Sequence, residues 1–144
     1  RSTGVLNKCN IKTMPHPGFP TDMQPQFSVL LSLANGTSMV NESVWDNRFR
    51  YVEELHKMGA QISVDGKLAV IEGVDHLNAA PVHACDLRAG AALVIAALAA
   101  NGTSTIEGIH YIERGYEHIV EKIQALGGQI ERVTEENPIG AQVV

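Results

Sequence analysis

The sequence predicts an α/β domain in which a βαβαββ unit is used nearly twice. Short motifs recur about 66 residues apart, helical and strand patterns alternate within each copy, and each copy carries an Asn-Gly pair at the same place. Self-similarity at a fixed period indicates a repeated supersecondary unit. Alternating strands and helices favour an α/β domain with a partly parallel sheet. We assign a first unit to about residues 15–75, a second unit to about 80–134 and a tail to 135–144.

Four pairs of matching positions carry the repeat. They are Asp22 with Asp86, the Asn-Gly-Thr-Ser at 35–38 with that at 101–104, Arg48 with Arg114, and the Gly-Ala-Gln-Ile at 59–62 with the Gly-Gly-Gln-Ile at 127–130. The period is too long for the common helical solenoids. The sequence therefore predicts two copies of one larger unit in a single domain.

In the first unit, a helix is predicted over residues 21–34, and the Asn-Gly pair at 35–36 ends it because both residues tolerate a left-handed cap. A strand over 37–44 follows. Apolar residues at helical spacing over 49–58 predict a second helix, which Gly59 ends.

The first unit closes with a predicted hairpin. Strands over 61–64 and 68–73 flank an Asp-Gly pair at 65–66, which is typical of a tight turn between antiparallel strands. A loop over 75–80 then leads to a short strand over 81–85.

The second unit repeats the first. We predict a helix over 86–100, an Asn-Gly end at 101–102, a strand over 103–109, a helix over 116–126 and a strand over 129–133. The run at 89–100 is apolar and rich in alanine, but it is too short to span a bilayer, which takes about 20 residues. We therefore expect a buried helix and no membrane partner.

Composition excludes several classes of function. The formal net charge of -5 leaves no general basic surface for nucleic acid. The cysteines Cys9 and Cys85 are far apart and do not form a disulfide framework, so a reducing compartment is expected. The six histidines show no ligand spacing with the cysteines, so no metal site is expected. No glycine-rich dinucleotide motif or P-loop occurs, and no cofactor is expected.

The candidate site residues fall at matched turns. Asp22, Arg48, Asp86 and Arg114 each lie between a predicted strand and a helix, and Arg88 lies in the first turn of its helix. A helix N-terminus carries partial positive charge, which disfavours arginine. Three arginines at such turns therefore indicate an anionic ligand between them.

A structural interpretation competes with this one. Asp86 could simply cap its helix, with Arg88 paired to it. The repeat favours the functional interpretation, because arginines at matched turns converge on one rim. Open α/β sheets bind ligands beyond the carboxyl ends of their strands.

Four motifs resemble the enolpyruvyl transferase family, in particular the branch that acts on UDP-N-acetylglucosamine. They are Phe-Pro-Thr-Asp-Met-Gln at 19–24, Asn-Arg-Phe at 47–49, Asp-Leu-Arg-Ala at 86–89 and Arg-Gly-Tyr-Glu at 114–117. The resemblance covers nearly the whole chain. The first motif is specific to that branch, whereas the sibling 5-enolpyruvylshikimate-3-phosphate synthases share the repeat without it. Trp45-Asp46 stands where the family has Phe-Glu.

The resemblance implies a reaction and a fold. Enolpyruvyl transferases of this branch move the enolpyruvyl group of phosphoenolpyruvate to the 3-hydroxyl of UDP-N-acetylglucosamine and release phosphate. The reaction is cytoplasmic and is the first committed step of peptidoglycan synthesis. The family fold has two domains, each an inside-out α/β barrel of three βαβαββ units, and this chain would hold about two of the three units of one domain.

The resemblance also implies catalytic roles for three residues. Asp22 matches the proposed general base that contacts the sugar hydroxyl, a role that suits a carboxylate whose pKa burial raises. Asp86 matches a second cleft carboxylate that helps to position groups during proton transfer. Arg114, also counted as catalytic, matches an arginine that binds phosphoenolpyruvate.

Substrate-binding roles are implied for further positions. Arg88 matches a second arginine on phosphoenolpyruvate, whose phosphate and carboxylate suit forked donors. Arg48 matches another cleft arginine, and Val44 matches a backbone contact to the UDP-sugar.

By this resemblance the chain is a C-terminal fragment. The N-terminal half, with its reactive-cysteine loop, would be the missing partner, and neither Cys9 nor Cys85 matches that cysteine. We expect the fragment alone to be inactive. Two alternatives stay open: a shikimate-pathway type of transferase, and a non-catalytic module that binds an anion or a sugar nucleotide.

Overall fold

The computed structural model describes residues 4–134, and its first sheet has four strands. Their order is β1 (Ile11–Lys12), β2 (Thr37–Asn41), β4 (Leu68–Glu72) and β3 (Gln61–Asp65). β1 runs parallel to β2, whereas β4 is antiparallel to both of its neighbours. The sheet is therefore partly parallel, and the β3–β4 hairpin forms at the predicted Asp-Gly turn. β1 was not predicted, and it lies just before the start that we assigned to the first unit.

The helices of the first unit are shorter than predicted. A 3-10 turn, η1 (Thr21–Met23), leads into α1 (Gln24–Ser32), which carries Pro25 in its first turn. Proline is tolerated there because the N–H groups of the first turn have no partner within the helix. The second helix, α2 (Val52–Lys57), lies within the predicted apolar stripe at 49–58.

The second unit reproduces the start of the first. Its elements are β5 (Pro81–His83), α3 (Leu87–Ala99), β6 (Thr105–Glu107), α4 (His110–Glu113) and α5 (Ile119–Ala125). β5 runs parallel to β6, just as β1 runs parallel to β2. The strand predicted over 103–109 is shorter than expected, because Gly108 turns the chain at a φ of 73° into the unpredicted helix α4.

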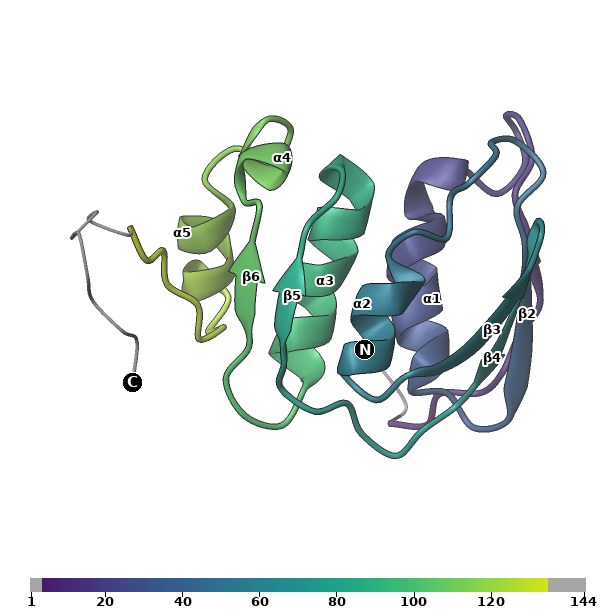
Figure 1. Cartoon of the computed structure of the whole chain (residues 1–144), viewed down its shortest axis with the longest axis horizontal. Helices are drawn as coiled ribbons and strands as arrows, with labels where there is room; N and C mark the ends of the chain where they lie inside the picture. The colour runs from purple at the N-terminus through teal and green to yellow at the C-terminus, as the bar shows by residue number, and fades with distance from the viewer. Residues whose placement is uncertain (1–3, 135–144) are drawn as a thin grey trace.

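Helices α1 and α3 pack against each other in the middle of the molecule (Figure 1). The four-stranded sheet lies on one side of this helix pair, and β6, α4 and α5 lie on the other (Figure 1). α3 is lined with small residues, which let neighbouring elements approach closely. A Cβ added at Gly90 would come within 2.5 Å of the Ile112 side chain on α4.

Two apolar clusters of unequal size hold the structure together. The larger one combines α1, α2, α3 and the first sheet, and its fully buried members include Leu31, Leu55, Ile71 and Leu93. The smaller one has only three buried members, Ala84, Val94 and Ile112, at the junction of α3 and α4. Among the described residues, no helix combines the length and the apolar character needed to cross a membrane.

One predicted strand is wrong. Residues 129–133 form no strand, and Val133 is 74% exposed. In the first unit the equivalent strand, β3, is held by its antiparallel partner β4. The described part of the chain contains no counterpart of β4 in the second unit, so the residues at 129–133 have no edge to pair with. The predicted tail at 135–144 lies outside the described residues.

Candidate active-site rim

An ion pair between Asp22 and Arg88 joins the two units at the N-terminal ends of α1 and α3. Arg88 Nε lies 2.5 Å from Asp22 Oδ1, and Nη2 lies 3.0 Å from Oδ2. Asp22 belongs to η1 and Arg88 to the first turn of α3, so the helix–helix packing sets their separation. The two parallel bonds are the forked geometry that arginine uses for carboxylates and phosphates.

Arg48 completes the cluster from the loop after β2. Its Nη2 lies 3.5 Å from Asp22 Oδ1, and its guanidinium lies 5.7 Å from the centre of the Trp45 ring. The preceding Asn47 has a φ of 55°, a left-handed conformation that asparagine tolerates better than most residues. The Nε of Arg48 is buried and has no acceptor among the described residues. Arg48 therefore keeps one donor unused beside Asp22.

The arginines hold Asp22 in its ionised form. The hydrogen bond from Arg88 lowers the pKa of Asp22, and the charges of Arg88 and Arg48 lower it further, against the opposing effect of burial. The Asp22 side chain is 55% exposed, and burial raises its pKa too little to outweigh the arginines, whereas a general base needs a raised pKa. The same bond raises the pKa of Arg88. In this form Asp22 is a poor proton acceptor, and its carboxylate occupies the forked donors of Arg88.

Asp86 plays a different part from its repeat partner. Its Oδ1 accepts hydrogen bonds from the backbone N–H groups of Arg88 at 2.9 Å and Ala89 at 2.8 Å, which makes it the N-cap of α3. The structural interpretation therefore describes Asp86 correctly. It does not describe Arg88, whose guanidinium pairs with Asp22 instead.

Arg114 stands at the next turn without joining the cluster. It ends α4, it is exposed, and its side chain makes no hydrogen bond or ion pair within the described residues. A Cβ added at Gly115 would come within 2.8 Å of the Leu87 side chain, so this turn lies against the start of α3. Tyr116 is near enough to act electrostatically on Arg88. The structure thus gathers Asp22, Arg48 and Arg88 and leaves Arg114 beside them.

Val44 lies in the turn between β2 and Arg48. Its backbone N–H donates to Oε1 of Glu42 at 2.9 Å. The family resemblance implies that the Val44 backbone contacts a sugar nucleotide. Glu42, which is 1% exposed, was not among the site residues predicted from the sequence. A signal was present, because Glu42 falls in phase with the buried Ser38 and Val40 of β2. A carboxylate on the inward side of a strand is unusual and calls for donors.

Cys85 is not prepared for nucleophilic chemistry. Burial and the neighbouring charge of Asp86 raise the pKa of its thiol, although Arg50 acts in the opposite direction. A reactive cysteine needs the reverse shift. Cys85 packs against the larger apolar cluster, in agreement with its interpretation as a small core residue.

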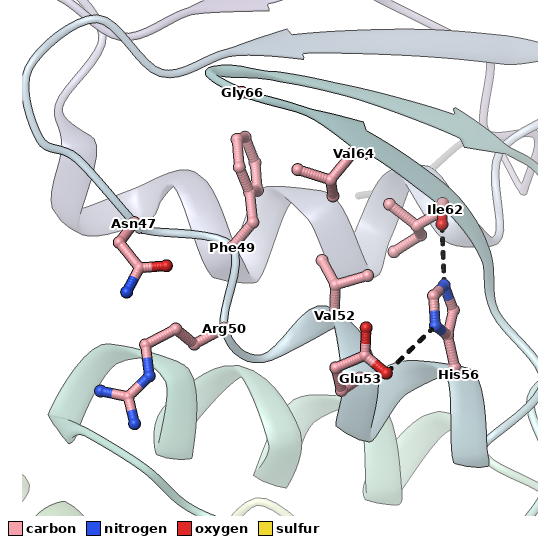
Figure 2. A pocket seen from close by; sticks show the side chains of 9 residues that line it. All are labelled: Asn47, Phe49, Arg50, Val52, Glu53, His56, Ile62, Val64 and Gly66. Atoms are coloured by element: carbon pink, nitrogen blue, oxygen red, sulfur yellow. Dashed lines mark hydrogen bonds and ion pairs between the residues drawn. The ribbon is translucent and has the colours of Figure 1, made fainter.

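The rim does not coincide with the hollow beside α2. An open hollow of about 330 Å³ lies between α2 and the β3–β4 hairpin (Figure 2), and none of Asp22, Arg88 or Arg114 lines it. In that hollow His56 contacts the carbonyl of Ile62 at 2.7 Å (Figure 2). Within residues 4–134, no three acidic, histidine or cysteine side chains are grouped so that they could hold a metal ion.

The curated relatives of this chain share one enzyme name. The chain is 55% identical over 135 residues to UDP-N-acetylglucosamine 1-carboxyvinyltransferase 3 of Caldanaerobacter subterraneus, covering 94% of this chain and 32% of that protein. It is 57% identical over 127 residues to UDP-N-acetylglucosamine 1-carboxyvinyltransferase 2 of Clostridium acetobutylicum, covering 88% of this chain and 30% of that protein. The chain thus spans about a third of the length of these curated relatives.

Solved structures agree on the fold. The enolpyruvyl transferase NikO from Streptomyces tendae matches 89% of this chain and 30% of its own with a TM-score of 0.81 at 33% identity. EPSP synthase from Acinetobacter baumannii matches 78% of this chain and 26% of its own with a TM-score of 0.61 at 20% identity, which is a likeness of fold alone. The predicted fold class is therefore confirmed.

The family model described as EPSP synthase (3-phosphoshikimate 1-carboxyvinyltransferase) matches residues 3–123. That span includes Asp22, Arg48 and Arg88 of the rim together with Asp86 and Arg114. The resemblance seen in the four motifs is confirmed by this match and by the relatives. The chain belongs to the EPSP synthase family of enolpyruvyl (1-carboxyvinyl) transferases.

Proposed function

We propose that this chain forms one wall of the active site of an enzyme that joins the enolpyruvyl group of phosphoenolpyruvate to the 3-hydroxyl of UDP-N-acetylglucosamine and releases phosphate. One observation carries the proposal: two arginines from different units converge on Asp22. A forked arginine beside a second, partly unpaired one suits a ligand that carries both a phosphate and a carboxylate. Identities of 54–57% to enzymes named for this reaction point to the same substrates.

The Asp22–Arg88 pair suggests how binding and chemistry are linked. An anion that takes the Arg88 fork displaces the carboxylate of Asp22, which then loses the interaction that contributes most to lowering its pKa. The pKa of Asp22 rises as a result, and the carboxylate becomes a better acceptor for the proton of the sugar hydroxyl. Phosphoenolpyruvate would thus prepare the base by binding. Arg48 supplies a further donor to the same anion, and Arg114 closes on it from the turn after α4.

The remaining parts of the proposal follow from the family. The enzyme would need no cofactor, act in the cytoplasm and serve the first committed step of peptidoglycan synthesis. Because the chain spans about a third of its relatives' length, we propose that the rest of such a protein completes the cleft. The chain alone would then bind its ligands weakly, since most of the ligand surface stays in water, and would not turn over.

Calorimetry tests this proposal directly. Phosphoenolpyruvate and UDP-N-acetylglucosamine are titrated, separately and together, into the chain and into its Arg88→Ala variant. Lys57→Ala is the control, because Lys57 is a cation that pairs with Glu54 at 2.7 Å within α2 and belongs to no part of the proposed site. We expect weak phosphoenolpyruvate binding that Arg88→Ala removes and Lys57→Ala preserves. Equal binding by all three proteins would rule out the rim as the phosphoenolpyruvate site.

A second candidate is the reaction of the sibling enzymes on shikimate 3-phosphate. The description of the matching family model favours it. The Phe-Pro-Thr-Asp-Met-Gln string at 19–24 and the names of the curated relatives favour UDP-N-acetylglucosamine. Competition between the two acceptors for the same chain separates these candidates, and we expect only the sugar nucleotide to add to the heat of phosphoenolpyruvate binding.

A further inference from the structure

Glu42 is a buried carboxylate that no cation among the described residues neutralises. It is 1% exposed, and four donors surround it instead. Oε1 accepts from Thr13 Oγ1 at 2.7 Å and from the backbone N–H groups of Val44 at 2.9 Å and Trp45 at 3.1 Å. Oε2 accepts from Thr21 Oγ1 at 2.8 Å. A carboxylate is kept ionised in the interior only when its lone pairs are satisfied in this way.

The four donors come from three separate segments. Thr13 follows β1, Thr21 opens η1 next to Asp22, and the two amides belong to the turn that leads from β2 to Arg48. Thr13 strengthens the junction, since its Oγ1 also accepts from the N–H of Ser43 at 2.9 Å. Glu42 is therefore the shared acceptor that links the turn before Asp22 to the turn before Arg48.

Protonation of the Glu42 carboxylate would break this junction, and the hydrogen bonds to Glu42 oppose that protonation. Burial raises the pKa of Glu42, but the hydrogen bonds from Thr13, Val44, Trp45 and Thr21 outweigh burial and leave the pKa below its ordinary value. The junction is accordingly intact at neutral pH.

We propose that Glu42 is a positioning residue of the active site, which holds the backbone of Val44 and Trp45 and, through Thr21, the turn that carries Asp22. It touches neither substrate. It sets the geometry in which the Val44 backbone meets the sugar nucleotide and in which Arg48 reaches Asp22. The use of this positioning in substrate binding rests on the proposed function. The positioning itself is a property of the ligand-free chain.

Amide hydrogen exchange measures the positioning without any ligand. Glu42→Leu keeps a similar volume and removes the acceptor, so we expect the Val44 and Trp45 amides to exchange at least about tenfold faster, as the loss of hydrogen bonds to a charged group implies. The amides of Val40 and Ala69 in the first sheet report global opening. Their protection should change only as much as the global stability of the variant does. Glu42→Gln should restore most of the protection, because its amide oxygen still accepts.

Glu54→Ala is the matched control. Glu54 is a partly buried carboxylate that likewise accepts a backbone N–H, from His83 at 2.8 Å, and it makes no hydrogen bond or ion pair with residues 42–48. We expect it to leave the Val44 and Trp45 amides unchanged. If Glu42→Leu does not fold, the unaltered chain is titrated: the Val44 and Trp45 amide resonances should shift together with the Glu42 carboxyl signal as the pH falls.

The outcomes separate the two proposals. Unchanged exchange in Glu42→Leu, or amide resonances that ignore the Glu42 titration, overturns the positioning role. Faster exchange accompanied by about tenfold weaker UDP-N-acetylglucosamine binding supports both that role and its purpose. A third outcome is that Glu42→Leu exchanges faster but the unaltered chain binds no UDP-N-acetylglucosamine. That outcome supports the positioning role and counts against the proposed function.

Discussion

The two repeat units place an aspartate at the same point and use it differently. Asp86 caps α3 through the N–H groups two and three residues later, at Arg88 and Ala89. The residues two and three after Asp22 are Gln24 and Pro25, and proline has no N–H to donate. A cap at Asp22 would lose one of its two donors, so the helix begins with a 3-10 turn and the carboxylate faces the arginines. The repeat matches the two aspartates in sequence, but Asp86 is the extended N-cap of α3 whereas Asp22 lies inside η1, and we infer that Pro25 disfavours a cap at Asp22.

The units also differ in how well they are packed. The first unit has a four-stranded sheet, and its helices α1 and α2 share the larger core with α3 of the second unit. The second has two strands, a small cluster and a last helix, α5, without a buried residue. Leu126, just after α5, is 88% exposed. Stability therefore resides in the first unit and along α3, and the rim lies where these two meet.

The largest expected effect tests whether the first unit is packed more tightly than the second. Leu55→Ala removes a fully buried side chain from the first unit and should lower the free energy of unfolding by about 2–5 kcal/mol. Ile123→Ala, on the half-exposed α5 of the second unit, should cost about 1 kcal/mol or less. Urea denaturation followed by circular dichroism measures both. Equal losses would show that the two units are packed equally well.

A smaller effect tests the two aspartates. Asp86→Ala removes the N-cap of α3 and should cost about 1 kcal/mol of stability. Asp22→Ala removes an exposed ion pair, which should change stability by less than about 1 kcal/mol while altering the response to phosphoenolpyruvate. Thermal unfolding and calorimetry on both variants provide the comparison. A larger loss of stability from Asp22→Ala than from Asp86→Ala would contradict the assigned roles.

The smallest effect concerns the proline itself. Pro25→Ala restores an N–H at the position that corresponds to Ala89. We expect Asp22 to divide its time between this N–H and Arg88, which should change phosphoenolpyruvate binding by no more than a few fold, because an N-cap and an exposed ion pair are of similar strength. Carboxyl chemical shifts of Asp22 report the change. Identical shifts before and after the substitution would show that the proline does not control the aspartate.

Local signals in the sequence were sufficient for most elements. The Asn-Gly pairs were predicted to cap their helices, but α1 ends earlier, at Ser32, and α3 ends at Ala99. The two glycines instead turn the chain toward the next strand, with φ values of 95° at Gly36 and 99° at Gly102. The Asp-Gly turn between β3 and β4 was equally local. β1 has only two residues, too few for an alternating pattern, and the strand predicted at 129–133 depended on a pairing partner that no local pattern can supply.

The site was less accessible to sequence reasoning. The repeat matched Arg48 with Arg114, but it is Arg88 that meets Arg48 at Asp22, whereas Arg114 lies beside the cluster. The contact of Arg88 with Asp22 joins residues of different units and depends on how α1 packs on α3. The general-base role implied for Asp22 suits a carboxylate whose pKa burial raises, whereas the structure shows an exposed, ion-paired one. Glu42 was missed because its donors come from segments far apart in the chain.

The pH dependence of the Asp22–Arg88 pair has a definite direction. The pKa of Asp22 in the folded chain lies below its ordinary value of 3.8. The pair therefore stabilises the fold above that pH, and its contribution is lost as the pH falls through the folded-state pKa. Because the pair is exposed, the contribution is small, and the pKa itself is the sharper observable.

The most direct test is the pKa of Asp22, measured from its carboxyl resonance with and without phosphoenolpyruvate. Without ligand, we predict a pKa below 3.8 that returns toward the ordinary value in Arg88→Ala. With saturating phosphoenolpyruvate, we predict a higher pKa, because the ligand takes the guanidinium from Asp22. A pKa of Asp22 that phosphoenolpyruvate leaves unchanged, while the ligand binds, would contradict the proposed exchange of partners at Arg88.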